Sequence, residues 1–112
     1  MAQEVLIIQT GTANTASVMA GLSRAGAQPV LANDPDLIAR AERVVLPGVG
    51  AMAAALRQLE QDGLVEAIRN RIASGRPTLA ICLGLQLLCE RSEESPDTKG
   101  LGVIPTLVQR FP

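Results

Sequence analysis

Short apolar runs alternate along this chain with segments of helical periodicity, and this alternation constrains the fold more than any other feature. The runs end at Ile8, Leu31, Leu46 and Cys82, and the first run, residues 5–8, is apolar at every position. A continuous apolar run is typical of a parallel strand that is covered on both faces. Strands that alternate with helices are typical of βαβ units. The sequence therefore predicts an α/β fold with a mostly parallel sheet.

Helical periodicity and capping residues predict a helix after each of these strands. Asp34 is expected to cap its helix, with Pro35 at the first helical position. We expect residues 90–100 to form a surface loop and residues 103–104 to open a fifth strand. The expected helices are at residues 17–25, 35–41, 52–61 and 64–74, with a last one after Cys82 that holds residues 85–88.

The composition is that of one globular domain and excludes several classes of protein. The chain has 112 residues, of which 47% are hydrophobic and 19% charged, so we predict a single folded domain over residues 1–112. A net charge of -1 and one aromatic residue, Phe111, argue against binding to nucleic acid. No run approaches the ~20 apolar residues of a membrane span. Glu4 stands where a signal peptide would be basic, so we expect a cytosolic protein.

The chain contains no histidine, and this count limits the chemistry that it can complete by itself. There are two cysteines, Cys82 and Cys89. On one helix they would lie about 10 Å apart along the axis, which is too far for a disulfide. Two sulfur ligands without an imidazole make a poor zinc site. We therefore predict neither a metal nor an organic cofactor.

Three glycine-bearing turns follow predicted strands, and the carboxyl ends of parallel strands meet at one edge of a sheet, where sites form. The turns contain Gly11, residues 47–50 and Gly84. The first of them, residues 11–14, lacks the lysine of a phosphate-binding loop. We interpret it as a structural turn in which Asn14 or Ser17 caps the next helix.

Cys82 has the sequence setting of a nucleophile on a sharp strand-to-helix turn. Small residues, Ala80 and Gly84, stand two positions to either side of it. A helix N-terminus stabilises a thiolate, and the backbone N–H of Leu83 could donate to an oxyanion. The alternative is that Cys82 is a small buried residue of the core. For Cys89 we favour that structural role.

Two further groups could bind a ligand beside Cys82. The glycines of residues 47–50 permit close approach of backbone to ligand, and the N–H of Val49 or Gly50 could be a second oxyanion donor; the alternative is a plain turn. Gln86 lies four residues after Cys82 and on the same helix face, where it either binds a ligand amide or is simply exposed. Acidic residues at 90, 93 and 94 are most simply a solvated helix end and loop.

Four segments together are more specific than any of these features. They are Leu-Pro-Gly-Val-Gly-Ala at 46–51, Ile-Cys-Leu-Gly-Leu-Gln-Leu-Leu at 81–88, Glu-Arg-Ser-Glu-Glu at 90–94 and Gly-Leu-Gly at 100–102. The combination resembles the class I (triad-type) glutamine amidotransferases, and within them the glutaminase subunits of imidazole glycerol phosphate synthase, from histidine biosynthesis. The resemblance runs over the whole chain but covers roughly the N-terminal half of that family's domain. It implies a truncated flavodoxin-like three-layer α/β/α fold.

The resemblance also implies a reaction and a partner. Glutamine would be hydrolysed to glutamate and ammonia, and the ammonia would pass to a cyclase subunit with a (β/α)₈ barrel. By position, Cys82 is the nucleophile that forms a glutamyl thioester. Leu83 and Val49 supply backbone N–H groups to the oxyanion, and the Val49 peptide reorients when the partner is engaged. Gly50 and Gln86 contact the substrate glutamine.

This sequence departs from the family's pattern, most of all in its lack of histidine. The family's catalytic His and Glu would lie beyond Pro112, so the chain alone is expected to be inactive. Thr10 and Met52 stand where aromatic residues are expected, and Ala80 where glycine is usual. Asn14 and Ser17 fall on the side that resembles the partner-facing surface, where residues 15 and 16 are Thr and Ala instead of the usual Leu and Arg.

Two alternatives follow from these departures. One is another elbow-cysteine hydrolase of the same superfamily. The other is a non-catalytic module, a truncated paralogue that binds the cyclase or dimerises. Half of a doubly wound sheet would leave a strand edge and an apolar face uncovered, which favours association.

Overall fold

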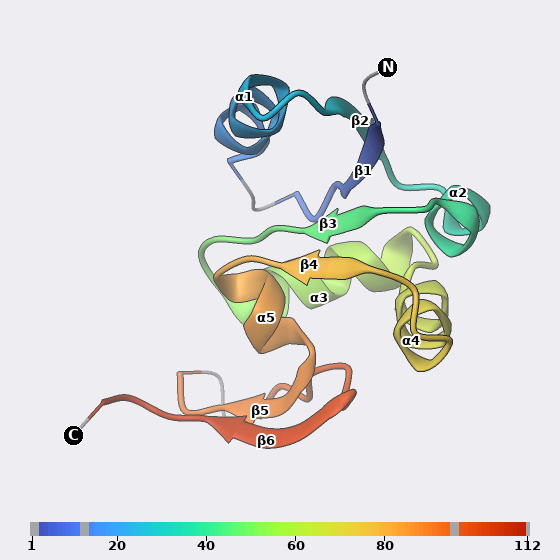
Figure 1. Ribbon diagram of the computed structural model, residues 1–112. Helices are drawn as coiled ribbons and strands as arrows, with labels where there is room; N and C mark the ends of the chain where they lie inside the picture. The colour runs from blue at the N-terminus through green and yellow to red at the C-terminus, as the bar shows by residue number, and fades with distance from the viewer. Residues whose placement is uncertain (1–2, 12–13, 95–96, 112) are drawn as a thin grey trace.

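A four-stranded parallel sheet forms the centre of the molecule (Figure 1). The computed structural model describes residues 3–11, 14–94 and 97–111, so residues 12 and 13 of the predicted first turn lie outside the described residues. The strand order is β2-β1-β3-β4. This arrangement confirms the predicted α/β fold. The strands are β1 (Glu4–Ile8), β2 (Gln28–Ala32), β3 (Val44–Leu46) and β4 (Thr78–Ala80).

Five helices in the described part of the chain follow the predicted pattern, and two of them, α1 and α2, begin at predicted capping residues. The Asn14 side chain accepts a hydrogen bond from the Ser17 N–H at 3.3 Å, and Asp34 accepts from the Asp36 N–H at 2.8 Å. None of these helices has the length and apolar character needed to cross a membrane. They are α1 (Thr15–Arg24), α2 (Pro35–Arg40), α3 (Met52–Gln61), α4 (Val65–Ala73) and α5 (Leu83–Leu87).

The two faces of the sheet are covered to different extents. Alternate residues of a strand point to opposite faces, so Leu6 packs with α2, α3 and α4 while Val5 faces α1. The first face carries the main core, to which α3 contributes four buried residues. On the second face α1 has no fully buried residue. Figure 1 shows α1 alone on its side of the sheet, and α3 and α4 on the other.

A second, two-stranded parallel sheet follows α5, and it corrects two predictions. It consists of β5 (Cys89–Ser92) and β6 (Ile104–Val108). Residues 90–100 are therefore not simply a loop. The strand predicted to open at residues 103–104 is present and begins at Ile104, but it pairs with β5 and not with the central sheet. Cys89 is not in a helix, because α5 ends at Leu87.

Distant amide groups account for the early end of α5. The carbonyl of Leu87 accepts the Leu101 N–H at 2.8 Å, and that of Leu88 accepts the Ile104 N–H at 2.8 Å. These carbonyls would otherwise continue a helix. Backbone amides of residues 101 and 104 thus bind the carbonyls that further helical turns would have used.

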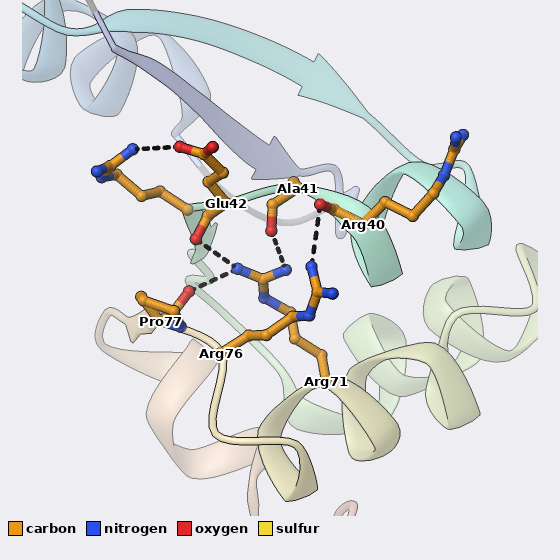
Figure 2. Close-up of polar contacts among 7 residues, drawn as sticks. Arg40, Ala41, Glu42, Arg71, Arg76 and Pro77 are labelled. Atoms are coloured by element: carbon orange, nitrogen blue, oxygen red, sulfur yellow. Dashed lines mark hydrogen bonds and ion pairs between the residues drawn. The ribbon is translucent and has the colours of Figure 1, made fainter.

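A buried arginine that no local sequence pattern predicts connects β4 to the rest of the fold. Arg71 of α4 is 2% exposed. Its guanidinium donates to the Pro77 carbonyl at 2.7 Å, and to the Thr78 hydroxyl at 3.1 Å. Burial lowers the pKa of Arg71, and the charge of Arg76 lowers it further. As Figure 2 shows, the guanidinium also donates to the backbone carbonyls of Ala41 and Glu42 in the loop before β3. It donates to the carbonyl of Ile38, inside α2, at 2.9 Å as well.

Candidate active site

Cys82 occupies a sharp turn between β4 and α5. Its backbone has φ 52° and ψ −120°, and among the described residues it is the one non-glycine residue with a positive φ. Such a conformation costs on the order of 1–3 kcal/mol and is concentrated at functional sites. The side chain is exposed. The alternative of a Cys82 buried in the core is therefore wrong, and the predicted bend is present.

Two glycines let this turn lie directly against the segment that follows β3. A Cβ atom added at Gly84 would be 1.9 Å from the Leu46 carbonyl oxygen, an impossible contact. One added at Gly48 would be 3.1 Å from the Gly84 nitrogen and from the Leu83 Cβ. The loop at residues 47–50 and the Cys82 turn are thus brought together as predicted.

The Leu83 amide already has a hydrogen-bond partner. It donates to the Gly48 carbonyl at 3.1 Å. That carbonyl belongs to the same peptide unit as the Val49 N–H, and in a trans peptide the two groups point in opposite directions. The Val49 N–H therefore points away from Leu83. The two predicted oxyanion donors are neighbours, but in this conformation they do not converge on one point.

Gln86 lies one turn after Cys82 on α5, and its N–H donates to the Cys82 carbonyl at 3.4 Å. The half-buried residue lines a pocket of about 290 Å³. Two acidic residues of the β5–β6 unit, Glu93 and Glu94, line the same pocket. The sequence pattern had predicted a solvated helix end and loop for these carboxylates. The remaining lining residues are Ser92, Val108, Gln109 and Arg110.

The pocket wall is held by two hydrogen bonds. The Arg110 N–H donates to the Glu93 carboxylate at 2.8 Å, and the Glu94 N–H donates to the buried Ser92 hydroxyl at 3.3 Å. No local sequence signal predicts this wall, because it depends on the pairing of β5 with β6.

Comparison with known proteins decides the family. The family model described as the CobB/CobQ-like glutamine amidotransferase domain matches residues 11–110. The chain belongs to this family.

Relatives and a solved structure agree with that assignment. The imidazole glycerol phosphate synthase subunit HisH of Syntrophotalea carbinolica is 45% identical over 96% of this chain and 52% of its own. The subunit of the same name from Geobacter sulfurreducens is 46% identical over 97% of this chain and 52% of its own. A structure titled as a crystal structure of glutamine amidotransferase superposes with a TM-score of 0.79 at 19% identity. It covers 95% of this chain and 56% of that chain, and it shows the fold alone. The amidotransferase chain described here thus spans about half the length of the curated relatives that it matches.

The residues that depart from the amidotransferase pattern are found both in the interior and on the surface. Thr10 and Met52, which replace expected aromatic residues, are 0% and 3% exposed and belong to the interior. Ala80 is half-buried in β4, and Ala16 is exposed in the first turn of α1.

The second cysteine of this amidotransferase domain has a structural setting. Cys89 is buried at the start of β5, and its thiol donates to the Leu85 carbonyl at 3.6 Å. Burial raises the pKa of this thiol, which disfavours the reactive thiolate. Both cysteines are free. In the described part of the chain no group of three or more His, Cys, Asp or Glu side chains could hold a metal ion.

Proposed function

We propose that this domain carries the glutamine-hydrolysing site of an imidazole glycerol phosphate synthase. The exposed Cys82, held at positive φ on the turn after β4, is the observation that carries the proposal. Its sulfur attacks the side-chain amide carbon of glutamine, the C–N bond breaks, and the nitrogen leaves with an added proton as ammonia. Water then cleaves the glutamyl thioester to give glutamate. The ammonia passes to a cyclase partner with a (β/α)₈ barrel.

The tetrahedral intermediate needs two backbone donors, and we assign them to Leu83 and Val49. Since the Gly48 carbonyl now accepts the Leu83 N–H at 3.1 Å, rotation of the Gly48–Val49 peptide would release Leu83 and turn the Val49 N–H inward. Gly50 follows the rotating peptide directly. Its φ is +89°, and because glycine adopts both signs of φ without steric cost, it can accommodate the rotation. Loss of one oxyanion donor costs about 10²–10³-fold in rate, so the conformation described here is catalytically impaired. In this proposal, binding of the partner drives the peptide rotation and completes the oxyanion hole.

Binding of glutamine is assigned to Gly50 and Gln86. Gln86 connects the Cys82 turn with the pocket that Glu93 and Glu94 also line. Their negative charge suits the ammonium group of an amino acid.

Proton transfer is the step that this chain cannot complete. It contains no histidine, and the thiol therefore lacks an imidazole base and the leaving nitrogen an imidazole acid. Loss of general acid–base catalysis costs about 10²–10⁴-fold. We propose that the chain alone does not turn over glutamine at a measurable rate.

A chloroketone analogue of glutamine tests the site without requiring turnover. We expect it to alkylate Cys82 and leave Cys89 unmodified in intact-mass and peptide analysis, and excess glutamine should slow the labelling. Gln86→Ala should weaken that protection about tenfold, whereas Cys89→Ala should leave it unchanged. Labelling that glutamine does not slow would contradict the glutaminase site. A separate assay of glutamine turnover by this chain with the cyclase added would reject the proposed inactivity if the rate matched that of a complete enzyme.

The lack of histidine also supports a second candidate, a module that binds the cyclase without catalysis. This module would bind the cyclase in sedimentation experiments, but glutamine would not protect Cys82 from the chloroketone.

A further inference from the structure

The loop at residues 47–50 is held at its first end by the Cys82 turn. Pro47 and Gly48 are both buried. A Cβ atom added at Gly48 would be 3.1 Å from the Gly84 nitrogen, and the Gly48 carbonyl accepts the Leu83 N–H at 3.1 Å. The first half of the loop is therefore in direct contact with the turn that carries the candidate nucleophile.

The second end of the loop is held by the first residue of α3. Met52 is 3% exposed and belongs to the main core. Its terminal methyl group reaches the chain between β5 and β6, because a Cβ atom added at Gly100 would be 2.8 Å from the Met52 Cε. The N-cap residue of α3, Ala51, supplies no side-chain hydrogen bond. The packing of Met52, and not a capping group, thus fixes the point where the loop becomes a helix.

The segment that Met52 contacts is itself firmly held. Four amides of residues 100–104 donate to the consecutive carbonyls of residues 87–90, at 2.8–3.1 Å. The first residue of this segment tolerates no side chain, because a Cβ atom at Gly100 would also be 2.1 Å from the Cys89 carbonyl oxygen. The Arg69 Nε of α4 donates to a further carbonyl of the segment at 2.8 Å. Met52 therefore packs against backbone that has little freedom to move.

The residues between the two held ends are free to change conformation. Val49, Gly50 and Ala51 are all exposed. Nothing lies within 4 Å of a Cβ atom added at Gly50. Backbone rotations in proteins are absorbed by a few loop positions of this kind. Rotation in this loop is thus confined to the part that carries the Val49 N–H.

We propose that Met52 and Gly100 are positioning residues for the Val49 N–H. Their contact holds the loop against the Cys82 turn, and it thereby sets how readily the Gly48–Val49 peptide rotates. This inference rests on the proposed function, in which that rotation completes the oxyanion hole. It also connects the loop to the β5–β6 unit that lines the pocket beside Gln86, because Gly100 donates to a carbonyl of β5 at 2.8 Å.

Amide hydrogen exchange, measured by NMR in this chain, tests the proposal. Rotation of the Gly48–Val49 peptide releases the Leu83 N–H, whereas the Gly84 N–H keeps its bond of 2.8 Å within the turn. Met52→Leu retains most of the side-chain volume but shortens its reach. We expect this variant to speed exchange at Leu83 relative to Gly84 by about fivefold or more. An unchanged ratio of the two rates would overturn the proposal.

Two further variants separate positioning from a general loss of stability. Met19→Leu makes the same replacement on α1, against the other face of the sheet, and should change the ratio by less than about twofold. Gly100→Ala adds a methyl group that displaces the Met52 side chain, and it should raise the ratio as Met52→Leu does. Global unfolding exposes both amides together, so equal acceleration at Leu83 and Gly84 would contradict the positioning role. No glutamine is present, and the result is therefore independent of the chloroketone experiment that tests the proposed function.

Discussion

The outer strands β2 and β4 end the same sheet, yet different interactions secure them. β2 pairs with β1 over five residues and carries a proline on its free side. β4 pairs with β3 over three residues and carries free-side N–H groups at Thr78 and Ala80. The shorter ladder is supplemented at its start by the Arg71 guanidinium, which joins Pro77 and Thr78 to the carbonyls before β3.

The difference between β2 and β4 matches the position of the candidate nucleophile, Cys82. β2, with Pro29 on its free side, lies at the end of the sheet opposite β4, and β4 leads directly into the Cys82 turn. The short ladder of β4 is held from within, because the buried Arg71 guanidinium donates to Pro77 and Thr78 at the start of this strand.

Among the changes considered, removal of the Arg71 guanidinium is expected to lower the free energy of unfolding most. Arg71→Met leaves four buried or half-buried carbonyls without their donor. We expect a loss of about 3–5 kcal/mol in the free energy of unfolding, measured by urea denaturation. Arg57→Met, on the exposed side of α3, is the matched control and should change it by less than about 0.5 kcal/mol. A loss below about 1 kcal/mol for Arg71→Met would show that β4 does not depend on this residue.

Replacement of the edge proline tests the other side of the comparison. Pro29→Val restores an outward N–H on β2 and frees the unfolded chain, so we expect a loss of about 0.4–1 kcal/mol in stability. Sedimentation should also show concentration-dependent association that the unchanged chain lacks at this edge. Gln28→Val adds the same apolar side chain at a position whose N–H already bonds to Gln3, and it should not associate. Association of both variants would attribute the effect to hydrophobicity alone.

The smallest expected effect on stability is a pH dependence that arises from Cys89. This thiol reports whether the start of β5 stays packed. Burial raises the pKa of this thiol above its usual value of 9.0, so above about pH 9 the unfolded chain loses the proton first and is favoured. The stabilising contribution is complete below that pH and is lost as the pH rises through the folded pKa. The free energy of unfolding should thus fall less between pH 7 and pH 10 in Cys89→Ala than in the protein that keeps this thiol. Both proteins carry Cys82→Ala, so that only the buried thiol differs; identical falls would contradict burial of Cys89.

Much of the fold and part of the site were predictable from local sequence. The run at residues 5–8, the Asp34-Pro35 helix start and the small residues around Cys82 are each recognisable within a few positions of the chain, so the strand, the helix and the turn could be predicted before their packing was known. The resemblance to the glutamine amidotransferases likewise rested on contiguous motifs, and the family model over residues 11–110 confirms it. The roles of Val49, Leu83, Gly50 and Gln86 in catalysis and binding stay predictions.

What tertiary structure alone decided follows from hydrogen-bond partners that are distant in sequence. The apolar pattern through residue 88 is compatible with a longer helix, yet amides from residues 101 and 104 take its last carbonyls and turn the chain into β5. Arg71 resembles any other helical arginine until carbonyls 30 or more residues away surround it. Periodicity and capping specify local elements because they depend on neighbours along the chain. Which buried polar groups satisfy one another depends on how those elements pack, and no local pattern encodes it.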